Sequence, residues 1–151
     1  MERSCYDGGL GLSQLPAGAE QLGRSEAMRL LASVAYGRIV FTFNALPAIR
    51  PLNHLVEHGL IILRTRLTSS VAIAAQPANA VVVNYEADNF DPLTQTGWAV
   101  VITGQAYTVT DPDQTSHYER SLLPWINHGT DTVLAIEPNI ITGFRIATKK
   151  P

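Results

Sequence analysis

The stretch GWAVVITGQAYTVT, residues 97–110, decides the fold of this 151-residue chain. Most of its residues are β-branched, aromatic or glycine, and neither proline nor a charged residue interrupts it. That composition is typical of a strand and predicts one long strand over residues 97–110. The shorter segments on either side must then build a sheet around this strand.

Several other segments also predict strands, and turn residues or short loops separate many of them. The dipeptide His58-Gly59 is expected to form a hairpin turn between two of them, and residues 88–96 are expected to be a polar loop. Pro51 lacks an N–H, so it marks a sheet edge or a bulge. The remaining predicted strands are 38–43, 48–56, 60–65, 80–87, 133–136 and 140–146.

Three helices are expected between the strands. Ser25 is a candidate N-cap for the first, which is predicted to end at Gly37. The second covers residues 69–76, and the third begins at Asp111-Pro112 and runs to about Leu123. Short, mostly antiparallel strands with helices only at intervals predict a mainly β (α+β) fold, a closed or partly closed β-barrel with a few peripheral helices.

The composition indicates the domain organisation and the kinds of partner to expect. The chain is 46% hydrophobic and 16% charged with a net charge of −2, which suits one compact domain. Glycines near the start predict a flexible leader over residues 1–20, followed by a single domain over 21–151. With no basic stripe, no run of about 18 apolar residues and a single cysteine, we expect no nucleic acid, no membrane partner and a cytoplasmic location.

A second stretch, RTRLTSSVAIAA over residues 64–75, carries the strongest chemical signal. Arginines and hydroxyls meet there where a predicted strand passes into a predicted helix. A helix N-terminus offers free N–H groups and a partial positive charge, so the junction is a candidate phosphate site. The alternative is that Ser69 only caps the helix and the arginines are solvated.

Other candidate sites are weaker. His54 and His58 flank a predicted hairpin, where four-residue spacing does not aim both rings at one metal ion, so no metal site is predicted. No serine lies in a G-x-S-x-G context. Asp88 and Asp91 are interpreted as solvated loop residues, and Trp98 as either a core residue or a residue at the edge of a cleft.

Four segments together resemble the pyridoxamine 5′-phosphate oxidase-like, FMN-binding split-barrel family, in particular its small actinobacterial-type members. The resemblance spans roughly residues 25–146, and its most specific parts are TGWAVVITGQA and IEPNIITGFRI. It implies a six-stranded antiparallel split β-barrel that pairs as a homodimer, with FMN at the interface. The four segments are GRIVFT, LPAIRPLNHLVEHGLIILRT, NAVVVNYEADNFDPLTQTGWAVVITGQAYTVTDP and LPWINHGTDTVLAIEPNIITGFRI.

The resemblance also assigns roles to residues. It implies that the flavin ring rests on residues 50–53, that the phosphate lies at the junction of residues 64–75, and that Trp98 lies near the flavin, often from the partner subunit. The implied cofactor-binding residues are Arg50, Pro51, Leu52, Asn53, Leu63, Arg64, Thr65, Ser69, Ser70 and Trp98.

The chain departs from the family at the phosphate junction. Many members read T-x-x-G-T-K, whereas residues 65–70 read TRLTSS, with Arg64 or Arg66 as the replacement cation. The resemblance implies an FMN-dependent oxidoreductase acting on a small-molecule substrate. The alternatives are a deazaflavin-dependent reductase, a non-catalytic flavin or tetrapyrrole binder, and a cofactor-free dimer.

Overall fold

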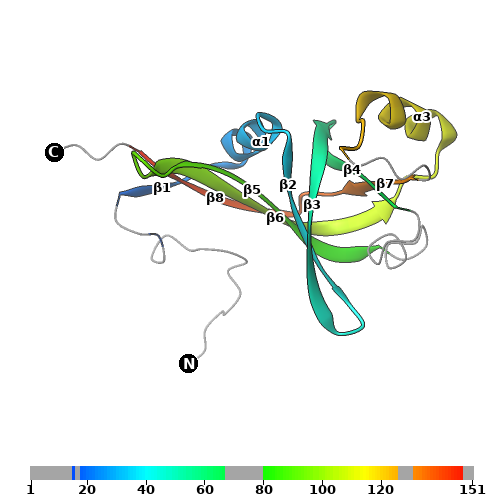
Figure 1. The fold of residues 1–151 in the computed structure, drawn as a ribbon, viewed down its shortest axis with the longest axis horizontal. Helices are drawn as coiled ribbons and strands as arrows, with labels where there is room; N and C mark the ends of the chain where they lie inside the picture. The colour runs from blue at the N-terminus through cyan, green and yellow to red at the C-terminus, as the bar shows by residue number, and fades with distance from the viewer. Residues whose placement is uncertain (1–14, 16–17, 67–79, 126–130, 148–151) are drawn as a thin grey trace.

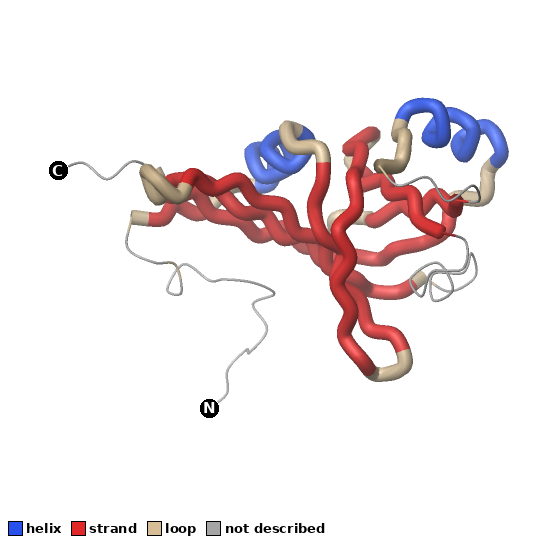
Figure 2. Tube along the Cα trace, in the orientation of Figure 1, coloured by secondary structure: helices blue, strands red, loops and turns tan. Residues whose placement is uncertain are grey.

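The computed structural model describes residues 15, 18–66, 80–125 and 131–147. In these residues the protein is mostly β: one eight-stranded sheet closes into a six-stranded antiparallel barrel, and two helices lie outside it (Figures 1 and 2). The predicted antiparallel split β-barrel is confirmed. The predicted helix over residues 69–76 lies outside the described residues.

The elements follow the chain in a simple order. Strands β1 to β6 and helix α1 come first, and α3 lies between β6 and the two final strands. Their bounds are β1 Ala19–Gln21, α1 Arg24–Ala32, β2 Tyr36–Phe43, β3 Leu46–Glu57, β4 Leu60–Arg66, β5 Val81–Asp91, β6 Thr96–Thr108, α3 Pro112–Ser121, β7 Asp131–Ile136 and β8 Ile140–Ile146.

Strand β6 closes the barrel. The strand order is β1-β8-β6-β5-β2-β3-β4-β7, and β7 returns to β6 through residues 106–108. The first half of β6, residues 97–103, pairs instead with β8, which carries β1 on its other side. Because one half of β6 serves the barrel and the other half an open extension, this long strand sets the split of the sheet.

Tight turns fix the register of the first two hairpins. Asn44 and Ala45 have φ of 53° and 63°, and His58 and Gly59 have φ of 54° and 75°. Two consecutive left-handed residues match the right-handed twist of the strands that they join. The predicted hairpin turn at His58-Gly59 is confirmed. Pro51 pairs with Arg38 of β2, while the described β3–β4 ladder begins only at His54.

Several predicted boundaries are wrong. Ser25, the predicted N-cap, lies inside α1, whose N-cap is Gly23. The polar segment 88–96 is a loop only over residues 92–95, since Asp88–Asp91 continue β5 and pair with β6. Helix α1 begins after Gly23 and ends at Ala32, and Gly37 lies inside β2. The end of β5, Asp88–Asp91, extends beyond the barrel, and its polar composition resembles that of a loop. The predicted end of the leader, residue 20, falls inside β1.

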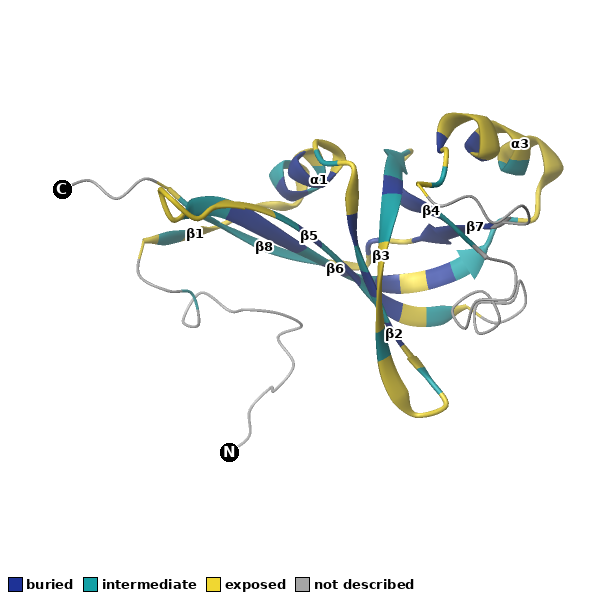
Figure 3. Cartoon of the chain, in the orientation of Figure 1, coloured by how far each residue is buried: buried dark blue, intermediate teal, exposed yellow. Residues whose placement is uncertain are grey.

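The interior consists of two apolar clusters. The larger fills the barrel and the space beneath α1, and Leu31, Ile39 and Tyr85 are among its fully buried members. The smaller lies under α3, where Tyr118 and Leu122 pack on Ile62 of β4. Buried residues alternate with more exposed ones along β2 and β5 (Figure 3). No helix in the described residues is long and apolar enough to cross a membrane.

Candidate functional site

Three strands place one polar or aromatic residue each in a single row. Tyr36 of β2 lies opposite Asn53 of β3, and the β3–β4 register that pairs His54 with Leu63 brings Arg64 next to Asn53. Directly opposed residues in antiparallel strands share a face, so Tyr36, Asn53 and Arg64 lie side by side on the outer face of the barrel. Two of the three are predicted cofactor-binding residues.

The segment after α3 crosses this row, and we call residues 122–125 the strap. Arg64 donates from Nη1 to the carbonyls of Leu122 at 2.9 Å and Glu119 at 3.1 Å. Asn53 donates from Nδ2 to Leu123 O at 2.8 Å. Helix C-terminal carbonyls lack intrahelical donors and carry partial negative charge, which the guanidinium of Arg64 complements. The row therefore fixes the strap over β3 and β4.

The strap ends at an exposed aromatic pair. The rings of Trp125 and Tyr36 lie 5.1 Å apart between centroids, tilted by 53°. The backbone N–H of Trp125 donates to Oδ1 of Asn53 at 3.4 Å. The Arg38 guanidinium lies 5.8 Å from the centroid of the Tyr36 ring. Trp125 is 63% exposed and Tyr36 44% exposed. A large aromatic surface is thus held open to solvent beside the outer face of β3.

A buried group of hydrogen-bonded residues lies on the inner face of β3. We call it the brace, and it consists of His54, Tyr85 and the carbonyls of Leu31 and Leu52. His54 is 7% exposed, and its Nδ1 lies 2.6 Å from the hydroxyl of Tyr85, which also donates to Leu52 O at 3.0 Å. The other ring nitrogen, Nε2, lies 2.8 Å from Leu31 O. Tyr85 belongs to β5 and reaches β3 by passing β2 at Gly37. The brace ties α1, β3 and β5 together.

Burial favours the electrically neutral form of the brace. Leu31 O only accepts, so Nε2 carries the hydrogen and Nδ1 of neutral His54 accepts from Tyr85. The single hydroxyl hydrogen of Tyr85 therefore serves both Nδ1 and Leu52 O. Burial lowers the pKa of His54 against an opposing hydrogen bond to Leu31, and burial raises the pKa of Tyr85. His54 is a packed structural histidine.

A charged cluster lies next to Pro51 on the outer face. Arg38 pairs with Glu86 at 3.2 Å and with Asp88 at 3.8 Å. Burial raises the pKa of Glu86 to about 7, and a hydrogen bond to Asp88 and its charge add to the rise, while Arg38 opposes it. The registers place Pro51, Arg38 and Glu86 in one row across β3, β2 and β5.

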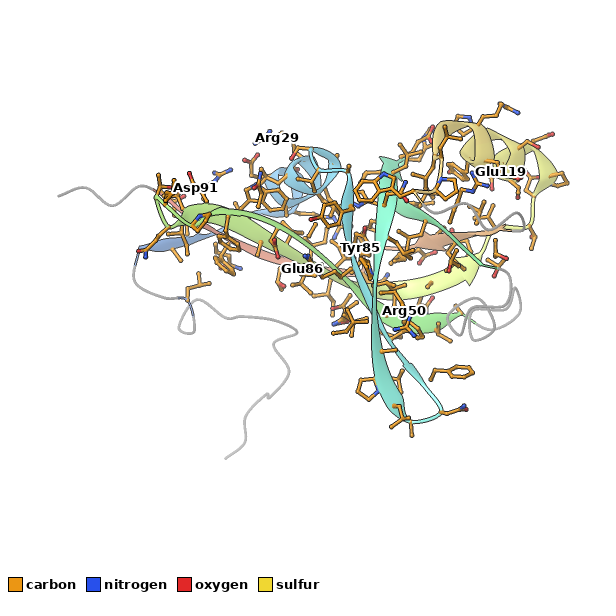
Figure 4. All side chains as sticks on the ribbon, viewed as in Figure 1. Arg29, Arg50, Tyr85, Glu86, Asp91 and Glu119 are labelled. Atoms are coloured by element: carbon orange, nitrogen blue, oxygen red, sulfur yellow. The ribbon has the colours of Figure 1, made fainter. Side chains whose placement is uncertain are left out.

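The structure distributes the predicted cofactor-binding residues over two faces. Pro51, Asn53 and Arg64 lie on the outer face; Arg50 and Leu52 have the opposite parity, and Arg50 is exposed (Figure 4). Leu63 is fully buried in the core. Thr65 follows Arg64 on β4 opposite Thr132. Ser69 and Ser70 lie outside the described residues.

Trp98 lies apart from the other predicted site residues within one chain. It is 8% exposed and packs in the large core cluster, on the half of β6 that pairs with Asn89 of β5 and Arg145 of β8. The row at Asn53 and Arg64 belongs to the barrel half of the sheet. Within this chain Trp98 is a core residue, and its contact with a flavin from the other subunit stays a prediction.

Sequence reasoning did not assign site roles to Tyr36 or the strap. The available signal was weak: an aromatic residue just before Gly37 and a tryptophan just after a proline. The described residues contain no group of three or more histidine, cysteine, aspartate or glutamate side chains that could hold a metal ion.

The six-stranded barrel places the chain in the class of split-barrel proteins. The profile of the pyridoxamine 5′-phosphate oxidase family matches residues 23–145. The chain therefore belongs to the pyridoxamine 5′-phosphate oxidase family, as the sequence resemblance predicted.

The chain is also similar to several individual proteins. An uncharacterized protein of Mycobacterium tuberculosis, Rv0080, is 59% identical over 128 residues, which span 83% of this chain and 84% of that protein. The solved FAD-binding protein of Mycobacterium smegmatis is 33% identical, with a TM-score of 0.68 over 83% of this chain and 96% of its own. A Corynebacterium diphtheriae protein of unknown function is 25% identical, with a TM-score of 0.68 over 86% of this chain and 99% of its own.

Proposed function

We propose that this protein is a flavin-dependent oxidoreductase that binds FMN on the outer face of β3 and β4 and transfers hydride or electrons to or from a small substrate. The observation that supports the proposal is the row of Tyr36, Asn53 and Arg64, because Asn53 and Arg64 are two of the residues that the resemblance assigns to the flavin. The flavin supplies the redox chemistry when bound, and the protein supplies position and charge.

The residues of this chain then divide the binding between them. The strand around Pro51 offers a flat surface without an N–H at that position, which suits a planar ring. Arg64 presents a planar cation suited to a phosphate, and its Nη1 contacts with the carbonyls of Glu119 in α3 and Leu122 in the strap fix its direction. Arg38 also lies next to Pro51, where its charge is paired with Glu86 and Asp88. A planar, anionic ligand complements this surface.

The first test identifies the ligand. Apo protein is titrated with FMN, FAD, riboflavin and a deazaflavin, and the holoprotein is then treated with a nicotinamide donor and reoxidised by added acceptors. We expect FMN to bind and its reduced form to turn over. Binding of FMN without reduction would favour a flavin carrier, tighter binding of deazaflavin would favour the reductase alternative, and a colourless protein that binds none of the four would contradict flavin binding.

The second test concerns the phosphate. A hydrogen bond to a charged group contributes about 1.5–3 kcal/mol, and each 1.4 kcal/mol is about tenfold in affinity. Arg64→Ala should therefore weaken FMN by about ten- to a hundredfold and riboflavin far less. Arg24→Ala is the matched control, because Arg24 also donates to a backbone carbonyl, Pro138 O at 2.9 Å, away from β4. Equal losses of FMN and riboflavin in Arg64→Ala would assign Arg64 to the fold alone.

The same proposal includes a homodimer. The registers place Ile140, Thr103, Asn84, Val40 and Ile49 in one row across β8, β6, β5, β2 and β3. Exposed apolar residues lie on this face. They include Ile49 at 58%, Val82 at 67% and Ile140 at 43% exposure. A second copy is the occupant that the family implies.

The dimer is tested by light scattering. An obligate pair should bury more than about 2,000 Å² in total and stay paired at micromolar concentration. We expect twice the 16.4 kDa mass of the chain, and Val82→Glu should shift the equilibrium toward one chain. A mass of 16.4 kDa for the unchanged protein would contradict the dimer. A cytoplasmic location stays a prediction of the sequence.

A further inference from the structure

We propose that Trp125, backed by Tyr36, is the aromatic residue that contacts the isoalloxazine ring of the bound flavin. The proposal rests on the proposed flavin site and adds to it a residue outside the ten that the sequence predicted. It also changes the expected role of the tryptophans, because Trp98 was the one expected near the flavin.

The position of Trp125 follows from three successive anchors. Beginning at α3, the chain is held to Arg64 through Glu119 O and Leu122 O, and then to Asn53 through Leu123 O. The N–H of Trp125 donates to the same Asn53 side chain. The residues that anchor the strap, Arg64 and Asn53, both belong to the outer row, so the strap runs along this row toward β2. Trp125 therefore reaches Tyr36 at the end of the row.

The anchors come from the two strands proposed to hold the flavin. Asn53 is two residues from Pro51, and residues two apart on a strand share a face. Arg64 is the proposed phosphate residue. A molecule that contacts both Pro51 and Arg64 on this face must pass the strap. The aromatic pair is therefore part of the same surface and not a separate patch.

The exposure of Trp125 and Tyr36 to solvent favours a ligand at this surface. Tryptophan at 63% exposure leaves most of a large apolar side chain in water, although the strap holds its backbone in place. A fixed aromatic surface loses little conformational freedom when a planar ring contacts it. Arg64 at the far end of the row carries a positive charge, whereas Arg38, 5.8 Å from the centroid of the Tyr36 ring, is paired with Glu86 and Asp88. A flat ring that carries a phosphate complements both features.

The two tryptophans of the chain offer matched variants. Trp98 is 8% exposed in the core, while Trp125 lies open on the strap. Tryptophan in contact with an isoalloxazine ring quenches flavin fluorescence by electron transfer, which acts only at close range. The experiment loads full-length wild type, Trp125→Phe and Trp98→Phe with FMN, and measures the fluorescence yield of the bound flavin and the retained FMN.

The expected result is a dark flavin in wild type and a several-fold brighter bound flavin in Trp125→Phe, with a smaller change in Trp98→Phe. Trp125→Leu should also weaken FMN by severalfold, since the aromatic contact contributes beyond its buried area. Thermal melting checks that each variant is folded.

An unchanged yield in Trp125→Phe overturns the inference, and a brighter flavin in Trp98→Phe alone assigns the contact to Trp98 instead. A changed monomer–dimer equilibrium in Trp125→Phe with an unchanged flavin also overturns it, because Trp125 would then contact the second copy. These outcomes differ from a failure of the proposed function, in which no variant and no wild-type protein retains FMN at all.

Discussion

The two faces of β3 differ in how their side chains are partnered within the chain. On the inner face, His54 and Leu52 have their polar atoms satisfied inside the chain, by Tyr85 and Leu31. On the outer face, Pro51 and Ile49 are exposed, and within the described residues it is the strap that covers the row at Asn53. One strand therefore carries both the interior of the barrel and the proposed binding surface.

The difference shows which residues serve the fold and which serve a ligand. Buried polar groups must find partners within the chain, because an unpartnered one costs about 1–3 kcal/mol. Side chains on the outer face remain in contact with water, so they do not each need a partner within the chain. Apolar, aromatic and cationic side chains can therefore lie there together. Changes on the inner face should affect folding, and changes on the outer face should affect binding.

The largest effect is expected at Gly37. A Cβ there would lie 2.4 Å from Glu86 O and 2.8 Å from the Tyr85 ring. Since backbone and a buried ring cannot both move, Gly37→Ala should lower the free energy of unfolding by about 3 kcal/mol or more. Denaturant unfolding measures it. Gly23→Ala is the control, because nothing lies within 4 Å of a Cβ there, and an equal loss in both variants would contradict the close approach at Gly37.

The next effect is expected at the Tyr85 hydroxyl. Tyr85→Phe keeps the ring but leaves Nδ1 of His54 and Leu52 O without their donor. We expect a loss of about 1–3 kcal/mol in the free energy of unfolding. Tyr36→Phe, on the exposed outer face, should change it by less than about 0.5 kcal/mol. Similar values for both variants would mean that the brace does not stabilise the inner face.

Much of the barrel was predictable from local patterns. The strand at residues 97–110 and the turn at His58-Gly59 follow from composition and turn chemistry, and the structure has both. The strand over Asp88–Asp91 was missed because polar residues on an extension beyond the barrel resemble a loop. Gly37 was assigned to a helix end because glycine is common there, whereas the fold uses it for a close approach between β2 and β5.

The candidate site was predictable only in part. The sequence marked Asn53 and Arg64 through a family resemblance, but their side-by-side placement depends on the β3–β4 register. The strap could not be found because it joins residues about 60 to 70 positions apart, such as Arg64 with Leu122 and Asn53 with Leu123. No local pattern encodes such a pairing.

A smaller effect is expected from the charge of Glu86. Its folded pKa of about 7 lies above the ordinary value of 4.5, so the folded chain holds a proton that the unfolded chain releases. This contribution is fully present below pH 4.5 and is lost as pH rises through about 7. The lowered pKa of His54 acts in the opposite direction, with stability lost as pH falls below 6.5.

The two contributions are separated by Glu86→Gln, which removes only the first. Relative to wild type, Glu86→Gln should become more stable as pH rises from 5 to 8, measured by unfolding at both values. Asp88→Asn should move the Glu86 titration toward lower pH, because the hydrogen bond and charge of Asp88 raise the pKa of Glu86. A constant difference between wild type and Glu86→Gln over this range would contradict the raised pKa.

The smallest effect on folding is expected at Arg50, which is exposed and donates to the carbonyl of its own neighbour, Ile49, at 2.8 Å. Without flavin, Arg50→Ala should change the free energy of unfolding by less than about 0.5 kcal/mol. A ligand that binds only the folded chain stabilises it in proportion to the logarithm of its affinity. If Arg50 helps to bind FMN, a loss of about tenfold in affinity should make saturating FMN stabilise Arg50→Ala by about 1.4 kcal/mol less than wild type. Melting with and without FMN gives both numbers, and a large loss without flavin would place Arg50 with the residues that hold the fold.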